Sequence, residues 1–527
     1  LEQGGNAVDA AVAAAFALGV SDPGGSGLGG FTYMLIVPRN GAAIAIDGST
    51  PAPLAADPAK LLAIRTEKRH FGYQAISVPT TPEILAHALE RYGTLELAEV
   101  LAPAIEIAGE GYRLSNNSIV WAQIYLDEIR ASSHLRFIVL EDGERLGRPG
   151  DRICRPELRQ TLERLAREGV DAFYRGPMAA EIAADIAHNG GFIQPVDLAR
   201  YRVREHQPLR SSYRGAEILS FPPPGGGAEV VQGLNILQTF STDVLAEPSV
   251  ERLHLLVEAA RIAHADRAQA IFSGEGAVGA FGIGHLSEQH ARDRAELITP
   301  GRAISNESLA PPGATTSFGD NTTHLSVIDR DGNAVSLTQT LCRVYGAKVA
   351  TPGLGFPYNC CLESLDFENP SSPFHLRPGG IYPTAMAPTV VRTESSVTVL
   401  GGAGSDRIAS TLIEVISNLI DRRMGLREAV VAPRVLWNSD HDPPRICLEI
   451  ADPITEADAN RLQSFGFEHM YRFRYPPGSD ANIGFFGGVN AVAYDARTGV
   501  FSGVGDPRRG GFALGPRVVA EPRRAER

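Results

Sequence analysis

Two threonines, Thr322 and Thr340, stand at opposite ends of a segment with the pattern of a β-hairpin. Residues 320–340 read DNTTHLSVIDRDGNAVSLTQT, with strand-forming runs on both sides of an Asp-Gly pair. Asp-Gly between two such runs is a strong hairpin signal. A three-residue loop that ends on a left-handed Gly332 places Thr322 directly opposite Thr340, and a two-residue loop still leaves them neighbours. The turn therefore predicts that the two hydroxyl groups meet.

Paired hydroxyl groups have both a structural and a chemical explanation. Cross-strand threonine pairs stabilise sheets modestly, and composition alone favours that explanation. Thr322, however, begins a strand directly after the polar segment 295–321, which is typical of a loop or linker. If the Asn321–Thr322 bond were cleaved, the free α-amine of Thr322 would be a general base for its own hydroxyl. This nucleophile needs no histidine, so we assign His324, on the same strand face, a packing or orienting role.

The N-terminal segment supplies elements that could position this hairpin. Residues 6–18, NAVDAAVAAAFAL, predict a helix that is buried because small residues lie on nearly every face. A glycine loop at 24–30 and a strand, FTYMLIV, follow it. The loop contains G-x-G-x-x-G, but a dinucleotide site needs the order strand, glycines, helix. The order here is reversed, so we predict a tight, close-packed turn.

The remaining chain alternates between helical and strand-rich regions. Residues 80–190 are mainly helical in pattern, and 249–272 predict a long amphipathic helix. His254 and His264 on that helix lack ligand spacing and are expected to be satisfied within the fold. Beyond the hairpin the pattern is strand-rich, interrupted by one helix at 405–424. Strands flanked by helices on both sides predict stacked sheets between helical layers.

Composition excludes several classes of protein. The 527 residues carry 49 Lys+Arg against 61 Asp+Glu, a net charge of −12, which argues against nucleic-acid binding. The best apolar stretch, 10–20, is too short to span a membrane. The five cysteines include no C-x-x-C pair, so we expect no metal and no cofactor. Sparse cysteine favours a cytoplasmic location, with the periplasm as the alternative if a leader precedes Leu1.

The hairpin segment TTHLSVIDRDGNAVSLTQTL resembles the start of the small subunit of γ-glutamyltranspeptidases. The likeness continues through GGNAVDAAVAAAFALGV, DAFYRGPMAAEIAADI, GGFIQPVDLARY, PPPGGG, HLLVEAARIAHADRA, MAPTVV and GDPRRGG, and covers nearly the whole chain. It implies an α+β fold, the four-layer αββα sandwich of N-terminal nucleophile hydrolases. It also implies autocatalytic cleavage between Asn321 and Thr322, which gives a large subunit 1–321 and a small subunit 322–527 that together form one fold.

The resemblance also implies roles for individual residues. Thr322 would attack the substrate amide and form an acyl-enzyme, and Thr340 would orient it. The glycine-rich stretch LGGAGSDRI at 400–408 places the oxyanion-hole amides at Gly404 and Ser405. A glycine-rich turn before a helix suits this role because its backbone N–H groups point outward, where the oxyanion charge develops. Without the hairpin, an ordinary strand-to-helix connection would be the better interpretation of this stretch.

The family's substrate-binding side chains are largely replaced in this sequence. Ser49 stands where transpeptidases hold the γ-glutamyl carboxylate with an arginine, and Cys342 stands where they have an asparagine. Ser364 occupies the position of the acid that binds the α-amine, and Thr384 begins the pair that replaces two serines. Loss of a charge-assisted contact should weaken glutamyl binding strongly. Arg343 and Arg407 are speculative anion partners, with surface arginine as the simpler interpretation.

We therefore expect a self-processing N-terminal threonine amidohydrolase or acyltransferase that acts on a small-molecule amide. Water is the expected acceptor, and γ-glutamyl compounds, cephalosporin-type side-chain amides and small amides such as oxamate are the candidate substrates. An oxamate-type hydrolase is the first alternative, because a small anionic amide needs no glutamyl clamp. An unprocessed binding or scaffold protein is the second. The expected assembly is the two subunits from one precursor, with a dimer of these heterodimers as a further possibility.

Overall fold

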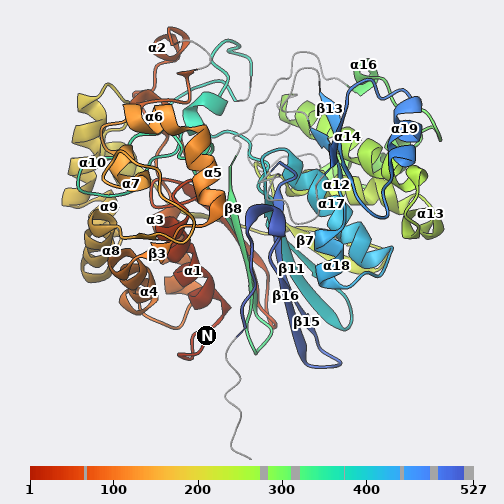
Figure 1. Ribbon diagram of the computed structural model, residues 1–527, viewed down its shortest axis with the longest axis horizontal. Helices are drawn as coiled ribbons and strands as arrows, with labels where there is room; N and C mark the ends of the chain where they lie inside the picture. The colour runs from red at the N-terminus through yellow and green to blue at the C-terminus, as the bar shows by residue number, and fades with distance from the viewer. Residues whose placement is uncertain are drawn as a thin grey trace, which may run out of the picture.

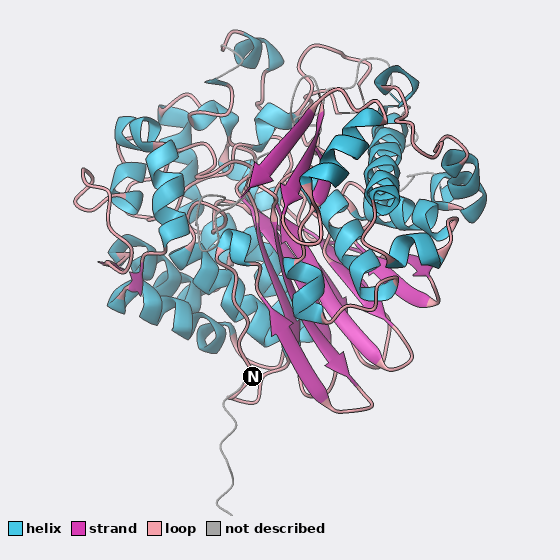
Figure 2. Ribbon diagram, turned by 45° about the vertical axis from the view of Figure 1, so that its right-hand side comes forward, coloured by secondary structure: helices cyan, strands magenta, loops and turns pink. Residues whose placement is uncertain are grey.

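The protein, described here from a computed structural model, consists of two sheets packed face to face between two layers of helices (Figures 1 and 2). The structure describes residues 1–64, 68–272, 283–309, 321–372, 374–438, 444–474 and 485–515. This arrangement confirms the predicted αββα sandwich. Its physical reason is that each sheet buries one face against the other sheet and one face against helices.

The first sheet carries the predicted hairpin. Its antiparallel strands lie in the order β5-β2-β1-β9-β8. They span Phe31–Val37 (β1), Ile44–Asp47 (β2), Arg204–His206 (β5), Thr323–Ile328 (β8) and Ala334–Thr340 (β9). The Asp329 N–H donates to the Asn333 carbonyl at 3.0 Å, and Gly332 has φ +85°. The predicted three-residue loop is therefore confirmed, and its register carries Thr322 to the position opposite Thr340.

The second sheet has the strand order β16-β15-β11-β10-β7-β6. Its strands are Leu209–Tyr213 (β6), Ala216–Ser220 (β7), Thr389–Arg392 (β10), Ser396–Ala403 (β11), Gly488–Asp495 (β15) and Val500–Val504 (β16). Polar groups link the two sheets across their interface. Ser336 Oγ on β9 donates to the Leu400 carbonyl, and Ser326 Oγ on β8 donates to the Asn490 carbonyl, each at 3.0 Å. These bonds fix the hairpin against β11 and β15.

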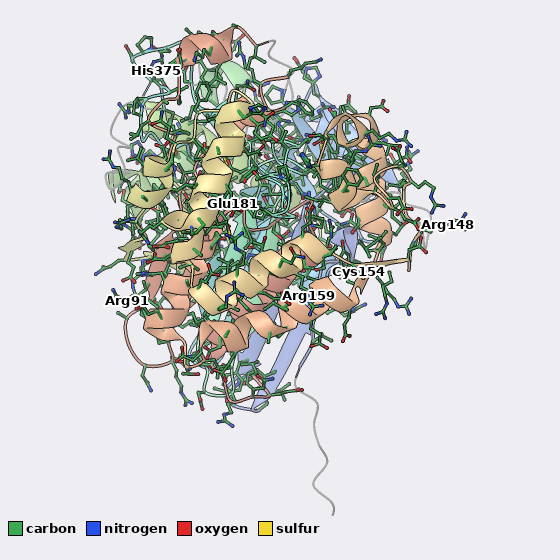
Figure 3. All side chains as sticks on the ribbon, turned by 90° about the vertical axis from the view of Figure 1, so that its left-hand side faces the viewer. Arg91, Arg148, Cys154, Arg159, Glu181 and His375 are labelled. Atoms are coloured by element: carbon green, nitrogen blue, oxygen red, sulfur yellow. The ribbon has the colours of Figure 1, made fainter. Side chains whose placement is uncertain are left out.

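Helices of the N-terminal half cover the first sheet, with α1 against β8 and β9 and α3 against β1 and β2. The Asn6 side chain caps α1 in a capping box with Asp9. Figure 3 looks onto the outer face of this layer, where Arg91, Arg159 and Glu181 point to solvent. The elements of this layer are Ala7–Ser21 (α1), Pro58–Leu62 (α2), Thr81–Tyr92 (α3), Leu97–Glu110 (α4), Asn116–Ile124 (α5), Leu126–Ala131 (α6), Leu135–Val139 (α7), Pro156–Glu168 (α8), Asp171–Tyr174 (α9), Pro177–His188 (α10), Pro195–Arg200 (α11) and the short strands Tyr112–Arg113 (β3) and Arg152–Ile153 (β4).

The second helical layer covers the other sheet, with α12 against β6 and β7 and α17 against β11. A small sheet, β12-β13-β14, joins this layer. Its elements are Gly227–Gln238 (α12), Thr242–Ala246 (α13), Val250–Phe272 (α14), Glu288–Ala295 (α15), Asn306–Leu309 (α16), Arg407–Ile420 (α17), Leu426–Val431 (α18), Glu456–Ser464 (α19), Val435–Asn438 (β12), Arg445–Ile450 (β13) and Met470–Arg474 (β14). Single 3₁₀ turns occur at Tyr73–Ala75 (η2), Ile283–Leu286 (η3), Cys361–Ser364 (η4) and Pro507–Arg509 (η5).

The long helix α14 differs from its prediction. It is not amphipathic, because nearly every side chain over 252–268 is buried among α12, α17, α19 and β12. Its charged groups are paired inside: Arg261 donates to the Glu258 carboxylate, and the His254 ring hydrogen-bonds the Arg302 carbonyl. The expectation of satisfied helix histidines is therefore confirmed for His254.

Two further points concern regions named in the sequence analysis. The core of the predicted linker, 310–320, lies outside the described residues. Among the helices that the structure describes, none has the length and apolar character needed to cross a membrane.

Candidate active site

The Thr322–Thr340 pair lies at the end of the hairpin, with both residues buried. Thr340 Oγ1 donates a hydrogen bond of 2.5 Å to the carbonyl oxygen of Asn321, the residue just before Thr322. The Cys342 backbone N–H donates to the same Thr340 oxygen at 2.9 Å. Because that N–H occupies a lone pair of the hydroxyl oxygen, it directs the Thr340 proton towards Asn321. The carbonyl ahead of Thr322 is therefore polarised by a fixed donor.

Asn321 itself is held by four further hydrogen bonds. Its N–H donates to the Cys342 carbonyl at 3.3 Å, and its amide Nδ2 donates to the Gly24 carbonyl at 2.9 Å. Its Oδ1 accepts from Arg509 Nη1 at 2.7 Å and from the Thr322 N–H at 3.0 Å. Arg509 lies in the C-terminal GDPRRGG stretch, and sequence reasoning did not single it out. The peptide group between residues 321 and 322 is thus fixed from both sides.

The glycine loop lies against the other face of β8. Thr323 Oγ1 donates to Asp22 Oδ2 at 2.6 Å. A Cβ on Gly25 would come within 2.4 Å of Thr323 Oγ1, so the loop needs glycine for this close approach. This confirms the interpretation of the loop as a close-packed turn. Burial raises the pKa of Asp22 to about 6, although the Thr323 hydroxyl and Arg509 oppose that shift.

His324 is buried between the two sheets, on the strand face that it shares with Thr322 and Ser326. Its Nδ1 hydrogen-bonds Thr338 Oγ1 at 2.8 Å and its Nε2 hydrogen-bonds Ser326 Oγ at 3.0 Å. Burial lowers the pKa of His324 to about 3, so the ring is neutral near neutral pH. Both ring nitrogens are used in hydrogen bonds, which fits the expected packing and orienting role.

The predicted oxyanion turn connects β11 to α17. Gly404 has φ +134°, and a Cβ there would meet Gly487 Cα at 2.8 Å, so only glycine fits. Ser405 is in the left-handed region at φ +59°, which is uncommon for a residue other than glycine. Arg407 is buried, and its Nε donates to the Gly404 carbonyl at 2.7 Å. Arg407 therefore braces this turn, and the interpretation of it as a surface arginine is wrong.

A small pocket, here the nucleophile pocket, brings most of the predicted site together. Its lining residues are Thr322, Thr340, Cys342, Tyr382, Thr384, Ala385, Met386, Ser405 and Ile408. It therefore unites the hairpin pair with the oxyanion turn and with two of the predicted substrate-binding residues. Hydroxyl, apolar and thiol side chains form its wall, and no charged side chain lines it among the described residues. Tyr382 was missed by sequence reasoning, because nothing in the spacing of residues marks it.

Two predicted substrate-binding residues lie behind this wall instead of lining it. Ser49 Oγ hydrogen-bonds the Tyr33 hydroxyl at 2.7 Å in the core of the first sheet. Ser364 Oγ lies 3.7 Å from Cys342 Sγ. Ser364 is separated from the pocket by Cys342, and neither Ser49 nor its partner Tyr33 lines it, so neither serine replaces the charged group of the family pattern at the pocket surface.

Three cysteines and a glutamate meet at the wall residue Cys342; we call Cys342, Cys360, Cys361 and Glu363 the thiol cluster, of which only Cys342 lines the nucleophile pocket. Hydrogen bonds from the Cys360 and Cys361 thiols lower the pKa of Cys342 well below its ordinary value. Burial raises the pKa values of Cys360 and Cys361 well above theirs. Burial also raises the pKa of Glu363 to about 7, against the opposing effect of Arg343, whose Nε donates to Glu363 Oε1 at 2.5 Å. Arg343 is therefore paired with a carboxylate of the protein.

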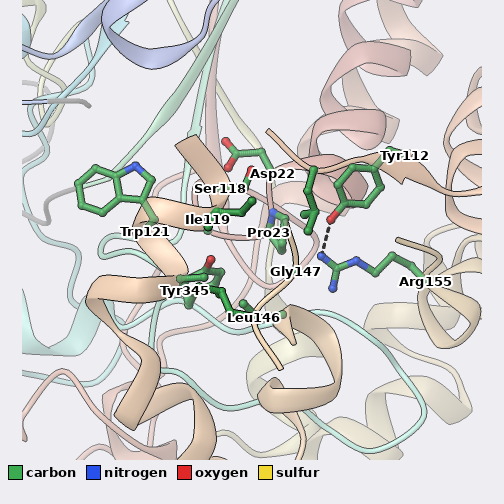
Figure 4. Close-up of a pocket in the computed structure, with 14 residues that line it drawn as sticks. Asp22, Pro23, Tyr112, Ser118, Ile119, Trp121, Leu146, Gly147, Arg155 and Tyr345 are labelled. Atoms are coloured by element: carbon green, nitrogen blue, oxygen red, sulfur yellow. Dashed lines mark hydrogen bonds between the residues drawn. The ribbon is translucent and has the colours of Figure 1, made fainter. Parts of the chain in front are cut away.

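Figure 4 shows a second pocket, here the side pocket, whose lining includes the loop residues Asp22, Pro23 and Gly24. The Asp22 carboxylate, the Trp121 indole and Tyr345 line it, and Arg155 hydrogen-bonds the Tyr112 hydroxyl at its edge. Gly24, which accepts the Asn321 amide, also belongs to its lining. Thr322 therefore lines the nucleophile pocket, while Asn321 hydrogen-bonds a residue that lines the side pocket.

An αββα sandwich with a threonine directly before a hairpin strand of one of its two sheets defines the class of N-terminal nucleophile hydrolases. Residues 1–515 match the sequence model of the family described as gamma-glutamyltranspeptidase. The chain belongs to the γ-glutamyltranspeptidase family, and it is an amide hydrolase or transferase of the N-terminal nucleophile type.

The relatives that are similar in sequence are named for two activities, acylase and glutathione hydrolase. The chain is 34% identical to the acylase ACY 1 proenzyme of Pseudomonas sp. strain SE83, over 93% of this chain and 86% of the relative. It is 32% identical to a glutathione hydrolase proenzyme of Pseudomonas sp. strain A14, over 98% and 91%. Among solved structures, a cephalosporin acylase from Bacillus halodurans superposes with a TM-score of 0.84 at 26% identity, over 97% of this chain and 92% of that one.

Proposed function

We propose that the chain cleaves itself between Asn321 and Thr322 and then hydrolyses an amide whose acyl group carries no glutamyl-type charges. The single observation that carries the proposal is the 2.5 Å hydrogen bond from Thr340 to the Asn321 carbonyl, directly ahead of a buried threonine. The products would be a large subunit 1–321 and a small subunit 322–527. Both would contribute strands to the first sheet, so they are expected to stay associated.

Self-cleavage would proceed as an acyl shift from nitrogen to oxygen. Thr322 Oγ1 attacks the Asn321 carbonyl carbon, and Thr340 donates a hydrogen bond to the oxygen as it gains negative charge. The peptide C–N bond breaks, the hydroxyl proton ends on the new amine, and an ester joins the two residues. Water then hydrolyses the ester, which leaves a carboxylate on Asn321 and a free α-amine on Thr322.

Turnover would use the same oxygen with a new base. The α-amine of Thr322 accepts the proton of its own hydroxyl as Oγ1 attacks the substrate carbonyl. The backbone N–H groups of Gly404 and Ser405 stabilise the oxyanion, at a turn whose conformation Arg407 braces. The proton passes to the leaving amine, the acyl group stays on Thr322, and water releases it in a second attack.

The composition of the nucleophile pocket favours an apolar acyl group. Cys342, Ala385, Met386 and Ile408 line it together with hydroxyl-bearing residues, and no arginine, lysine, aspartate or glutamate lines it among the described residues. A γ-glutamyl group would leave its carboxylate and ammonium without opposite charges there, which is costly in a buried site. We therefore favour acylase-type hydrolysis over γ-glutamyl hydrolysis.

The two alternatives are supported less well. An oxamate-type substrate needs a cation for its carboxylate, but Arg343 is paired with Glu363 and Arg407 holds the oxyanion turn. An unprocessed binding protein would have no use for a donor fixed on the Asn321 carbonyl. The side pocket, with the half-buried Asp22 and the Trp121 indole, would bind the amine half of the substrate once cleavage has released the Asn321 end.

A substrate panel tests this proposal. Processed protein is assayed with amides that share one chromogenic amine and carry γ-glutamyl, oxamoyl, glutaryl, aliphatic or phenylacetyl acyl groups, together with a cephalosporin side-chain amide. We expect the highest kcat/KM for an uncharged acyl group and a value at least about 100-fold lower for γ-glutamyl. Highest activity on the γ-glutamyl amide would overturn the acyl assignment, and highest activity on oxamoyl would favour the first alternative.

A further inference from the structure

The thiol cluster contains a set of soft and hard ligand atoms that the proposed hydrolysis does not use. The Sγ atoms of Cys342 and Cys360 and a carboxylate oxygen of Glu363 all lie within 4.8 Å of one another. We propose that these three residues form a binding site for a thiophilic divalent cation such as Zn²⁺, and that the bound ion blocks the nucleophile pocket. The site goes beyond hydrolysis itself, because binding can be measured on protein that turns over no substrate.

The distances fit a tetrahedral ion. Zn–S bonds of about 2.3 Å and Zn–O bonds of about 2.0–2.2 Å require ligand atoms about 3.5–3.8 Å apart. Cys360 Sγ already lies 3.5 Å from Glu363 Oε1. The other two pairs of ligand atoms, which both involve Cys342 Sγ, are at most 4.8 Å apart. They must therefore approach by about 1 Å at most, which a small rotation of the Cys342 side chain can supply. Glu363 lies in the 3₁₀ turn η4, Cys360 directly precedes that turn, and Cys342 lies two residues beyond the end of β9.

Neighbouring groups hold these ligands in place. Arg343 Nε donates to Glu363 Oε1, as groups behind a metal-binding carboxylate commonly do. On the other side, Ser364 Oγ lies 3.7 Å and the Tyr382 hydroxyl 3.9 Å from Cys342 Sγ. Cys361 Sγ donates to the Tyr382 hydroxyl at 3.4 Å, so the third thiol is engaged behind the ligand set.

Simple packing explains this cluster less well than a ligand role. Buried thiols often act as small apolar side chains. Here, however, the Glu363 carboxylate, on a side chain that is 10% exposed, lies against the thiol of Cys360, which costs free energy unless a cation compensates it. Cys342 also adopts φ +80°, a conformation that favours glycine or asparagine. Arg343 supplies one compensating charge, and a bound divalent ion would supply charge for the two thiolates.

The position of Cys342 determines how an ion reaches the site and what a bound ion does to the nucleophile pocket. Cys342 lines the same pocket as Thr322 and Thr340, so an ion can enter from the substrate side. Three protein ligands leave a fourth position, which water would fill. A charged, hydrated ion in that wall would exclude an apolar acyl group. This consequence, unlike the binding, rests on the proposed function.

Cadmium titration tests the binding directly. The full chain, reduced with a phosphine, is titrated with Cd²⁺ while the ultraviolet thiolate-to-cadmium absorption is followed, and Zn²⁺ is then added as a competitor. We expect one ion per chain, displaced by Zn²⁺. Cys360→Ser and Glu363→Gln should each weaken binding, by at least about 100-fold for the thiol and about 10-fold for the carboxylate.

Matched controls come from the other cysteines. Cys447, a buried thiol on β13, and Cys154, an exposed thiol on the outer helical face in Figure 3, are each replaced by serine. Both variants should bind Cd²⁺ as the wild type does. Thermal unfolding checks that every variant is folded, and Glu363→Gln carries the test if Cys360→Ser is not. Absence of the absorption band, or a band that survives in both ligand variants, would overturn the site.

The activity arm separates the two parts of the proposal. Zn²⁺ should inhibit hydrolysis of the best panel substrate competitively in the wild type and in Cys447→Ser, and at least about 10-fold less potently in Glu363→Gln. Stoichiometric binding without competitive inhibition would overturn the blocking role while leaving the site. Protein that hydrolyses none of the panel but binds Cd²⁺ would count against the proposed function alone.

Discussion

The two walls of the nucleophile pocket are built in different ways. One wall depends on backbone groups: the Cys342 N–H directs Thr340, and the turn proposed to supply the oxyanion amides brings Ser405 into the same pocket as Thr322. On the other wall, side chains decide the character of the pocket, and here Cys342 stands where the family pattern has an asparagine, with Tyr382 in the same lining. Cys342 belongs to both walls, through its backbone in one and its thiol in the other.

This difference explains how a family can keep one reaction while its substrates change. The wall built from backbone groups, here called the frame, tolerates side-chain replacement as long as the φ and ψ angles of its residues are preserved. The wall built from side chains, here called simply the wall, selects a different substrate with each replacement. Substitutions that change only the frame or only the wall test whether the two can be altered separately.

The largest effect is expected from removing the nucleophile itself. Thr322→Ala should abolish both self-cleavage and turnover, because no other hydroxyl occupies the same position. On a denaturing gel the wild type should give fragments of roughly 34 and roughly 22 kDa, in proportion to chain length, from the 56.3 kDa chain. The variant should stay as one band.

Thr322→Ser provides the matched control, since it keeps a hydroxyl and should still cleave, though more slowly. Amide hydrolysis by Thr322→Ala would mean that the nucleophile is assigned wrongly. An uncleaved wild-type chain that is nevertheless active would contradict the role of the α-amine.

Thr340→Val should have the next largest effect, because it removes the donor to the Asn321 carbonyl at nearly constant volume. We expect self-cleavage to slow by about 10²–10³-fold, as for other oxyanion donors. Time courses of the two fragments on a gel measure this rate, and Thr340→Ser should restore most of it. Cleavage of the valine variant at the wild-type rate would show that the frame does not need this hydroxyl.

His324→Gln tests the polar layer that supports the frame between the sheets. The pKa of His324 is lowered to about 3 in the folded protein, against an ordinary value near 6.5. Between these values the unfolded chain binds the proton and the folded chain does not, so the contribution of His324 to stability is present above pH 6.5 and is lost as pH falls. Acidification from pH 7 to pH 4 should therefore destabilise the wild type by on the order of 3 kcal/mol more than the glutamine variant.

Urea unfolding at several pH values measures that difference. Asp22 and Glu363, whose pKa values are raised to about 6 and about 7, contribute with the opposite sign in both proteins and cancel in the comparison. Equal pH dependence of the two proteins would mean that His324 does not stay neutral in the fold.

Cys342→Asn separates the two walls most directly, because it restores the family's residue and keeps the backbone N–H. Asparagine tolerates the φ of +80° at this position. We expect unchanged self-cleavage, together with a fall in kcat/KM for the best apolar substrate of about 10-fold or less, mainly through KM. A large loss of self-cleavage would show that the thiol, and not only the backbone, belongs to the frame.

The sequence predicts the frame much better than the wall. The Asp-Gly turn and strand alternation are local signals, and they suffice to place Thr322 opposite Thr340. The thiol cluster depends on the path of the loops between residues 341 and 386, which tertiary contacts determine. No spacing rule brings Cys342 to Cys360 and Tyr382. Likewise, the pattern of α14 could not reveal that Arg261 and Glu258 pair inside a fully surrounded helix.

Ser405→Gly should have the smallest effect, and it tests the frame at its most strained residue. Ser405 is held at φ +59°, which glycine adopts without penalty. Removing the side chain should therefore raise the free energy of unfolding by no more than about 1 kcal/mol. Hydrolysis should stay within about threefold of the wild type, since the amide N–H remains. If the rate of hydrolysis instead falls by about 10²–10³-fold, the hydroxyl of Ser405 acts in the reaction. The frame would then depend on side chains too.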